Sequence, residues 1–434
     1  MPARKKSGRQ GLRIVSNSQP LTVVICADHG SITGGQAKVA IESALGLKQG
    51  SARVIFFAAA APVDARLREA GVEVVCLGQT DLLGNASRAK AMLQGTWNSA
   101  ASKALGELLA GLPKQNVIVH VHGWARALSP SIARPIAASG LPAVYTVHEY
   151  FLFCPNGGFY NYQKDEVCSL KPLSASCFAT NCDQISYPRK IWRGGRLLMA
   201  KRLARLPAVF SDYICLSDFQ RGVIGSYLPA GARVTRISNP IDAPDLGPKE
   251  NPAAGEFIFV GRLSPEKGVF LFAEAAAKLG VPATFVGDGP LKEELRARFP
   301  NARLLGWQDS ENVRQAMRAA RALVFPSLWF EGQPLTVLEA KALGTPVIVA
   351  DQCAGRDEIE DGVSGLWFAS GDAGALAGAM SRLSDAGLVT RMSQAAYESY
   401  WRAPATLIRH VERLDALYRD MLAPPATAVY RASS

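Results

Sequence analysis

The chain has 434 residues, which is long enough for two or three domains with substantial hydrophobic cores. Hydrophobic residues make up 48% and charged residues 20%, a balance that excludes disorder, collagen or coiled coil as the main architecture. The formal net charge is +11, and residues 1–245 hold 28 basic and only 15 acidic residues. Such a field attracts a partner that carries phosphate, whether nucleic acid, anionic lipid or a phosphorylated substrate.

No apolar stretch approaches the roughly 20 residues that a membrane-spanning helix needs, so we expect no integral membrane protein. Residues 1–20 are predicted to form a disordered basic tail, and they lack the apolar segment of a secretory signal. Eight cysteines are too few for a disulfide scaffold in a chain of this length. We therefore expect a cytoplasmic protein, with attachment to the inner face of the membrane left open.

From Leu21 onward, short β-rich runs alternate with amphipathic stretches of helix length, which is typical of parallel sheets covered by helices. The strands expected in the first half are LTVVICA, RVIFFA, VEVVCL, NVIVHVH, PAVYTVH and DYICLS. After a segment rich in Pro and Gly, the alternation restarts with EFIFVG, PATFVG, ARLLG, ALVFP and PVIVA. This pattern predicts an α/β protein with two doubly wound, Rossmann-like domains.

The predicted boundaries follow from these changes in pattern. The first domain spans 21–240 and contains a cysteine-bearing insertion at 151–190, the linker spans 241–255, and the second domain spans 256–400. A helix at 401–422 has apolar residues at three- and four-residue spacings, so one face should pack against another element, and 423–434 is a tail. Ligands of doubly wound sheets bind beyond the carboxyl ends of the strands, so function should lie in those loops.

Three glycine-containing loops follow predicted strands. In HGSITGGQ, Gly34 and Gly35 precede a helix and would let the backbone approach a phosphate. In GRLSPEKG, Gly261 allows close approach, while Arg262 and Lys267 could hold a diphosphate. The third loop is VGDGP. Each is also compatible with an ordinary tight turn bearing solvated side chains.

The segment EGQPLTVLE places Glu331 on a loop that enters a helix and Glu339 about one turn inside that helix. Free N–H groups at a helix start favour a diphosphate, while carboxylates accept hydrogen bonds from sugar hydroxyls. The alternative is that one glutamate caps the helix and the other is solvated.

In this order and spacing, the motifs resemble those of the glycosyltransferase family 4 enzymes. The resemblance rests on Gly34 and Gly35, HVHGW, VHE, SNPID, GRLSPEKG, VGDGP, FPSLWFEGQPLTVLEA and DGVSGLWF, and so covers nearly the whole chain. It implies the GT-B fold, in which two Rossmann-like domains face each other across a cleft and a C-terminal helix crosses back to the first domain. The second domain would then bind a nucleotide-sugar.

The resemblance also implies roles for individual residues. Glu339 would bind the ribose, Glu331 would lie beside the donor sugar, and Arg262 and Lys267 would hold the diphosphate. His148 would contact the donor sugar near the reacting centre, although a lone histidine is often structural. The segment Gly332, Gln333, Pro334 and Leu335 would bind the donor through backbone N–H groups, with Gln333 bearing on sugar choice. Two further histidines, His120 and His122, are weaker candidates.

The implied activity is retaining transfer of a hexose from a UDP- or GDP-sugar to a saccharide or lipid-linked saccharide in cell-surface polysaccharide or lipopolysaccharide assembly. No cofactor would be required for catalysis. A non-catalytic binder of glycans or nucleotide-sugars and a sugar-nucleotide epimerase remain alternatives. Nucleic acid is not an expected partner, because the chain has no recognised binding module and no stripe of basic and aromatic residues.

The insertion holds half of the cysteines, at Cys154, Cys168, Cys177 and Cys182. Four thiolates could hold a structural zinc ion, but the spacing is loose and contains no CxxC pair. Reduced structural thiols and disulfides are the alternatives.

A basic helix is predicted at 189–206, with Trp192, Met199, Leu203 and Leu206 on one face and cations opposite. This pattern suits a helix on an anionic membrane surface, and equally an ordinary surface helix that packs its apolar side on the domain.

Overall fold

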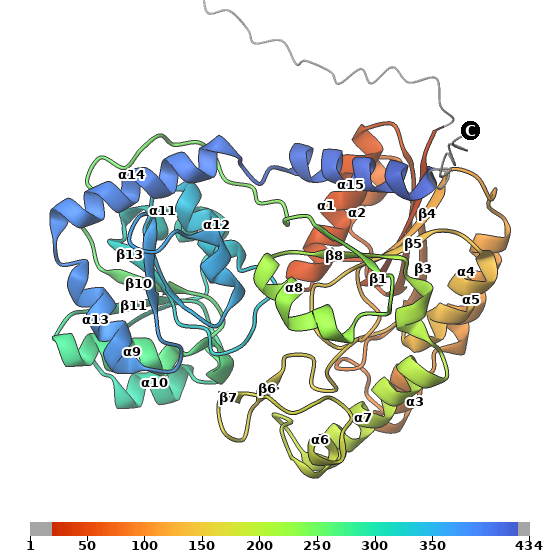
Figure 1. The fold of residues 1–434 in the computed structure, drawn as a ribbon, viewed down its shortest axis with the longest axis horizontal. Helices are drawn as coiled ribbons and strands as arrows, with labels where there is room; N and C mark the ends of the chain where they lie inside the picture. Colours follow the sequence, from red (N-terminus) through yellow and green to blue (C-terminus); the bar gives the residue numbers. More distant parts are fainter. Residues whose placement is uncertain (1–19, 424–434) are drawn as a thin grey trace, which may run out of the picture.

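The computed structural model describes residues 20–423, so the basic tail at 1–19 and the tail at 424–434 lie outside the described residues. Two α/β domains lie side by side in Figure 1, the N-terminal one on the right and the C-terminal one on the left. This arrangement confirms the expected pair of doubly wound domains. Among the described residues, no helix is long and apolar enough to cross a membrane.

The N-terminal domain is built on one parallel sheet, in which β1 lies between β2 and β4. In spatial order its strands are β3 (Glu73–Gln79), β2 (Arg53–Ala60), β1 (Thr22–His29), β4 (Val117–Val121), β5 (Ala143–Thr146), β8 (Asp212–Cys215) and β9 (Arg233–Arg236). Its helices are α1 (Gly35–Gln49), α2 (Ala65–Glu69), α3 (Arg88–Thr96), α4 (Ser99–Ala110), α5 (Ala133–Ser139), α6 (Ala175–Ala179), α7 (Tyr187–Arg202) and α8 (Asp218–Ile224).

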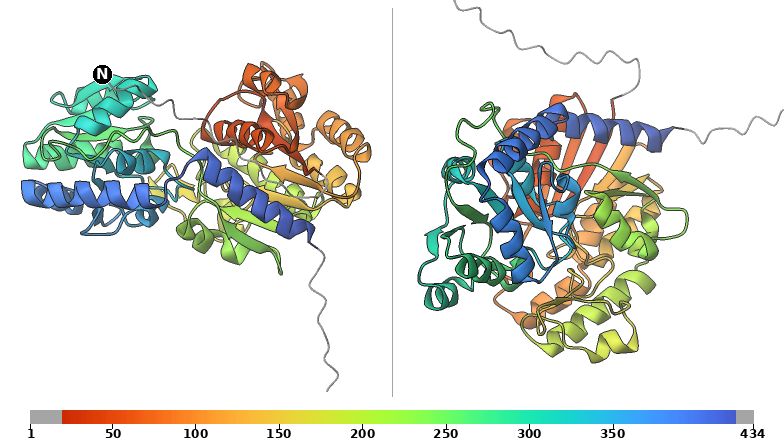
Figure 2. Two further views of the ribbon diagram at one scale, coloured as in Figure 1. Left: turned by 90° about the horizontal axis from the view of Figure 1, so that it is seen from above. Right: turned by 60° about the vertical axis from the view of Figure 1, so that its left-hand side comes forward.

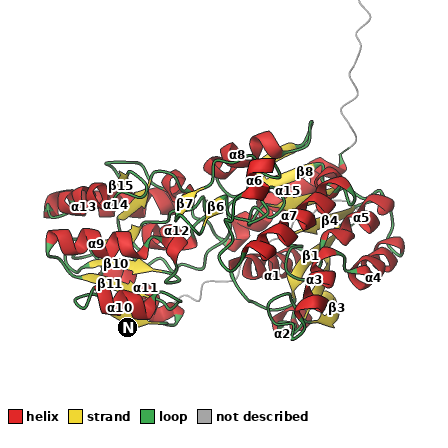
Figure 3. Ribbon diagram, turned by 90° about the horizontal axis from the view of Figure 1, so that it is seen from below, coloured by secondary structure: helices red, strands yellow, loops and turns green. Residues whose placement is uncertain are grey.

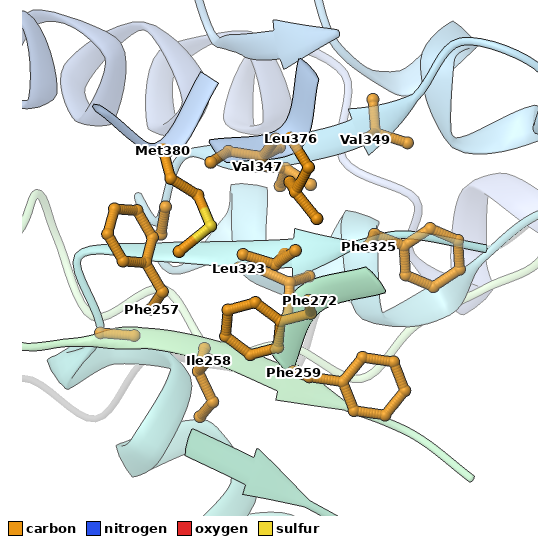
Figure 4. Close-up of a cluster of buried hydrophobic side chains, with 14 of the residues drawn as sticks. Phe257, Ile258, Phe259, Phe272, Leu323, Phe325, Val347, Val349, Leu376 and Met380 are labelled. Carbon is orange, nitrogen blue, oxygen red and sulfur yellow. The ribbon is translucent and has the colours of Figure 1, made fainter. Parts of the chain in front are cut away.

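The C-terminal domain repeats this plan around a second parallel sheet. Its strands are ordered β12 (Arg303–Gly306), β11 (Ala283–Val286), β10 (Phe257–Val260), β13 (Ala322–Phe325), β14 (Val347–Ala350) and β15 (Gly365–Phe368). Its helices are α9 (Val269–Leu279), α10 (Lys292–Arg298), α11 (Ser310–Ala319), α12 (Leu335–Ala342), α13 (Ala373–Arg382) and α14 (Ala386–Arg402). Strand side chains such as Phe257 and Leu323 meet Phe272 of α9 and Met380 of α13 in the core (Figure 4).

The strand expectations hold except at three places. β9 is a short edge strand whose residues are exposed or half-buried, so it gives no apolar run, and GLWF of β15 was read only as part of a motif. The insertion contains an unforeseen hairpin of β6 (Tyr160–Asn161) and β7 (Glu166–Val167), which lies at the junction of the domains (Figure 3).

The C-terminal helix crosses back to the first domain, as expected, but it begins at Leu407 rather than at 401, because residues 401 and 402 belong to the preceding helix, α14. α14 ends at Arg402, and α15 (Leu407–Leu422) begins after Pro404 and lies on the N-terminal domain (Figure 2). Leu414, Leu417 and Tyr418 of α15 are buried in the N-terminal core. This packing fixes the second domain relative to the first.

A close helix contact supports this crossing, and it yields a stability prediction. A Cβ added at Gly46 of α1 would come within 2.5 Å of a Val411 methyl group and 3.2 Å of Leu407. We expect Gly46→Leu to lower the free energy of unfolding by about 1–3 kcal/mol through overpacking, measured by chemical denaturation. Gly378→Leu on α13 is the control, because nothing lies within 4 Å of its Cβ. Equal stability of the two variants would contradict the packing.

The basic segment predicted at 189–206 is α7 only as far as Arg202. The helix buries Lys190, Gly194, Leu197 and Ala200, so its packed face differs from the predicted one. Arg205 has φ 54°, and Leu206 begins a short 3-10 turn and is fully buried. The predicted apolar face of the helix is therefore not continuous. Leu206, its last residue, lies in the domain core and not on the helix.

Candidate active site

The loops after β10 and β11 are packed backbone against backbone at the carboxyl edge of the C-terminal sheet. Gly287 has φ 135°, and a Cβ there would lie 1.9 Å from the carbonyl oxygen of Gly261. No side chain fits this contact, so Gly287 in VGDGP serves the fold of the loop. The packing holds the loop that carries Arg262 and Lys267 close to the sheet.

Lys267 and Glu331 form an ion pair at the centre of this edge. The Nζ atom of Lys267 lies 2.6 Å from Oε1 of Glu331, and the hydroxyl of Ser327 donates to the same oxygen at 2.8 Å. Their side chains are only 22% and 10% exposed. Lys267 also lies 5.2 Å from the ring centre of Trp329. The structure thus brings together two residues that the sequence separates by more than sixty positions.

Arg262 is exposed on the same loop, and within residues 20–423 it forms no ion pair. Its guanidinium is available to a ligand, whereas the ammonium of Lys267 already has a carboxylate partner. A diphosphate bound here would meet one cation without a protein partner and one that is positioned by Glu331.

Glu339 lies in the first turns of α12, where it is half-buried. Burial raises the pKa of its carboxyl, while Lys38 of the N-terminal domain and Arg314 act in the opposite direction. α12 begins after Pro334, and no side chain caps its N-terminus. The helix start therefore keeps backbone donors for a ligand close to a carboxylate.

The glycine pair on the N-terminal domain lies at the start of α1, where no side chain caps the helix. Both Gly34 and Gly35 are exposed, and a Cβ at either position would meet nothing within 4 Å. Packing within the described protein does not require glycine at these positions. The open backbone is suited to close approach by an anionic ligand.

His148 follows β5 and stacks on His122 from the end of β4. The His122 Nδ1 and His148 Nε2 atoms are 3.0 Å apart, with ring centres 5.2 Å apart. Burial lowers the pKa of His148 to about 3 and that of His122 well below its usual value. Both rings are therefore neutral at neutral pH and act through hydrogen bonds rather than charge.

His120 has a structural environment. It is fully buried, with Nδ1 2.6 Å from the hydroxyl of Tyr418 on α15 and Nε2 2.7 Å from Oγ1 of Thr146. Both ring nitrogens are occupied by protein partners. His120 thus ties the crossing helix to the sheet, and of the two weaker histidine candidates only His122 contacts His148.

Glu149 lies beside His148 and is a second titratable group at this strand end. Burial, followed by the nearby charge of Asp28, raises the pKa of its carboxyl to about 8, while Arg196 and Arg126 oppose the shift. The hydroxyl of Tyr145 donates to Glu149 at 3.4 Å. A carboxyl with this pKa is mostly protonated at pH 7 and can donate a hydrogen bond.

This shift predicts a pH dependence of stability. Because the folded-state pKa lies above the usual 4.5, the folded protein holds this proton in a window where the unfolded chain has lost it. Stability is therefore lost as the pH rises from about 4.5 to about 8. We expect the melting temperature of Glu149→Gln, relative to wild type, to be higher at pH 8.5 than at pH 5. Glu107→Gln, at an exposed site, is the control, and its difference in melting temperature from wild type should be the same at both pH values. The same constant difference for Glu149→Gln would contradict the raised pKa of Glu149.

Backbone and side-chain ties hold the two sides of the cleft together. The hydroxyl of Tyr150 donates to the carbonyl oxygens of Phe330 and Glu331 at 2.8 and 2.9 Å. The hydroxyl of Ser217 donates to the carbonyl oxygen of Gly332 at 2.9 Å. These bonds place the Glu331 segment directly against the strand end that carries His148.

The side chain of Gln333 has a different environment from the one expected. It is buried, its Oε1 accepts from the backbone N–H of Asn239 at 2.8 Å, and its Nε2 donates to Glu358 at 2.9 Å. Both polar ends are bonded to protein. The structure thus gives the side chain a role in tying the interdomain segment to the cleft, and gives no support to a role in sugar choice.

Three residues at the cleft were not singled out from the sequence. Trp329 lies over Lys267, and its indole N–H is buried without a hydrogen-bond partner among the described residues. The charge of Lys38, which lies on α1 one turn after the glycine pair, acts to lower the pKa of Glu339. Tyr162 of the insertion is close enough to Arg262 for the charge of that arginine to act on the pKa of its hydroxyl. The available signals were the place of Trp329 inside the motif FPSLWFEGQPLTVLEA and the place of Lys38 just after HGSITGGQ.

The four cysteines of the insertion are free thiols. Within residues 20–423, no group of three or more His, Cys, Asp or Glu is arranged to hold a metal ion. The fully buried Lys190 lies among these thiols, with its Nζ 3.6 Å from Sγ of Cys177. A buried ammonium disfavours a second cation at the same place. The structure therefore gives no support to the zinc site.

The chain is similar in sequence to known glycosyltransferases. The family model described as glycosyl transferases group 1 matches residues 254–386. The chain is 28% identical over 344 residues to an Escherichia coli UDP-Gal:alpha-D-GlcNAc-diphosphoundecaprenol alpha-1,3-galactosyltransferase, covering 74% of this chain and 80% of the relative.

Two solved structures share the fold. The Anabaena HepE protein in complex with UDP has a TM-score of 0.63 at 16% identity, covering 92% of this chain and 100% of HepE. The lipopolysaccharide outer core galactosyltransferase WaaB in its apo form has a TM-score of 0.62 at 18% identity, with the same coverage. At these identities the likeness concerns the fold alone.

Proposed function

We propose that the chain is a glycosyltransferase of the family 4 type, which transfers a hexose from a UDP- or GDP-sugar to a saccharide or lipid-linked saccharide. The acceptor belongs to cell-surface polysaccharide or lipopolysaccharide assembly, the setting of the relatives that act on a diphosphoundecaprenol saccharide and on the lipopolysaccharide outer core. The observation that carries the proposal is the Lys267–Glu331 ion pair just before the uncapped start of α12, with Arg262 exposed on the loop that carries Lys267.

In this proposal the donor lies across the carboxyl edge of the C-terminal sheet. Its diphosphate binds Arg262, Lys267 and the backbone N–H groups of the segment 332–335, and its ribose binds Glu339. UDP bound to HepE is consistent with a nucleotide in this fold. The exposed backbone at Gly34 and Gly35 faces the same ligand from the N-terminal domain.

We propose that the reaction retains the anomeric configuration. The bond between the anomeric carbon and the phosphate oxygen breaks as the acceptor oxygen bonds to that carbon from the same face. The acceptor proton passes to the departing phosphate oxygen, so no enzymic nucleophile is required. Arg262 and Lys267 stabilise the charge that develops on the diphosphate, as preorganised donors do in other enzymes. Neutral His148 hydrogen-bonds the donor sugar, and protonated Glu149 can donate to the acceptor.

The domain surface beside α7 is proposed to lie against an anionic membrane. Ile191, Leu198 and Leu203 are 41%, 43% and 59% exposed there. Arg189, Lys201 and Arg202 lie on the same helix. Exposed aliphatic groups next to cations are typical of interfacial helices.

Incubation of UDP- and GDP-hexoses with the protein and no acceptor tests the proposal. A transferase is expected to release free nucleoside diphosphate slowly from one donor class, detected by chromatography. An epimerase would return a nucleotide carrying an altered sugar, and a non-catalytic binder would return every donor unchanged. Either of the last two results would contradict the proposed function.

A further inference from the structure

A second basic site is formed entirely by residues of the N-terminal domain. A pocket of about 490 Å³ opens between α3 and α7, which lie next to each other at the lower right of Figure 1. Trp192 of α7 lines it and donates through its indole N–H to Thr96 of α3 at 3.0 Å. All of its lining residues fall between 82 and 196, so none belongs to the C-terminal donor site.

Arginines dominate the polar part of this pocket. The five that line it are Arg88, Arg126, Arg189, Arg193 and Arg196. Within residues 20–423 only Arg193 forms an ion pair, with Asp183 at 2.9 Å. Arg196 is buried, and its guanidinium donates to the carbonyl oxygen of Ala125. The other four arginines that line this cavity have no carboxylate partner at contact distance among the described residues, which suits a ligand with several negative charges.

The rest of the lining is apolar and partly open to solvent. Leu83, Met92 and Ile185 are 53%, 46% and 68% exposed, although each is a large hydrophobic side chain. Trp192 and Phe151 extend this surface inside the pocket. A nucleotide or a sugar phosphate would leave these aliphatic groups in water, whereas a ligand with an apolar chain would cover them.

The pocket also adjoins the strand ends that carry the candidate catalytic groups. Ala125 and Arg126 follow β4, shortly after His122, and Phe151 lies two residues after Glu149. Arg126 and Arg196 both act on the pKa of Glu149. A sugar joined directly to an anionic group in the pocket would therefore lie towards Glu149.

We propose that this pocket binds the acceptor as a saccharide carried on a lipid diphosphate. The arginines hold the diphosphate, the aliphatic rim covers the first units of the apolar chain, and the sugar extends to the cleft. The inference rests on the proposed transferase function and names its acceptor class. It assigns Arg126 and Arg189 as acceptor-binding residues.

Titration with farnesyl diphosphate, inorganic pyrophosphate and farnesol tests the site, with binding followed by calorimetry. We expect farnesyl diphosphate to bind at least tenfold more tightly than either of the other two. The double variant Arg126→Gln/Arg189→Gln should weaken that binding at least tenfold, because both side chains are at least partly exposed and their loss leaves the core intact. Arg68→Gln, at an exposed position on α2 outside the pocket lining, is the matched control.

Two results would overturn the assignment. Equal affinity for pyrophosphate and farnesyl diphosphate would show an anion site without a lipid component. Unchanged affinity in the double variant would place the lipid elsewhere. Titration of the same proteins with UDP and GDP separates the claims, because nucleotide binding should be unchanged in the double variant. If wild type binds a nucleotide but not farnesyl diphosphate, only this inference is refuted. If wild type binds neither UDP nor GDP, the proposed function is refuted.

Discussion

Arg262→Ala is expected to lower kcat by about 100- to 1,000-fold while donor affinity falls much less. The exposed guanidinium has no ion-pair partner among the described residues, so its removal leaves no buried charge and the fold should be unaffected. Its contribution arises when charge develops on the departing diphosphate, and preorganised donors of this kind are worth about this factor in kcat. Steady-state kinetics together with donor binding by calorimetry separates the two effects.

The matched control for this variant is Arg296→Ala on α10. Arg296 is exposed in the same domain and pairs with Glu293. Its loss should alter neither kcat nor donor affinity. Turnover of Arg262→Ala at the wild-type rate would remove Arg262 from the donor site.

The Lys267–Glu331 pair allows stability and catalysis to be separated. Lys267→Met leaves the carboxylate of Glu331, which is 10% exposed, without its cation, so we expect a loss of about 3 kcal/mol in unfolding free energy together with loss of activity. Adding Glu331→Gln removes the unpaired charge. The double variant should therefore recover most of the stability, measured by chemical denaturation, and remain inactive.

Stability and activity of these variants distinguish a structural role of the pair from a catalytic one. Recovery of both stability and activity in the double variant would make the pair purely structural. Glu331→Gln alone should fold, because the amide can still accept from Ser327, and its residual activity reports the direct contribution of the carboxylate.

The sequence predicted the framework well, because buried parallel strands are continuous apolar runs such as TVVICA and FIFV. The same signal fails where a strand is exposed, as in β9, or very short, as in the β6–β7 hairpin. α7 was predicted to extend to 206, but the chain adopts φ 54° at Arg205 and buries Leu206. Packing against the domain, which periodicity does not encode, decided that boundary.

The sequence predicted which loops form the site, but not the contacts between their side chains. The loops carrying Arg262, Lys267 and Glu331 could be named from their motifs, but the 2.6 Å ion pair depends on how two distant loops fold together. Gln333 lies inside the strongest motif, and its side chain nevertheless bonds to Asn239 and Glu358. The arginine pocket is formed by α3, α7 and four loop segments, of which the sequence had singled out only α7 and the insertion at 151–190.

Calorimetric titration of wild type and Glu339→Ala with UDP, GDP and ADP tests the central claim most directly. We predict that one nucleotide class binds and that the variant binds it about tenfold or more weakly, since a hydrogen bond to a charged group is worth about 1.5–3 kcal/mol. Glu293→Ala, at an exposed position on α10, should bind like wild type. Binding of no nucleotide, or equal binding by wild type and Glu339→Ala, would contradict a nucleotide-sugar site at the start of α12.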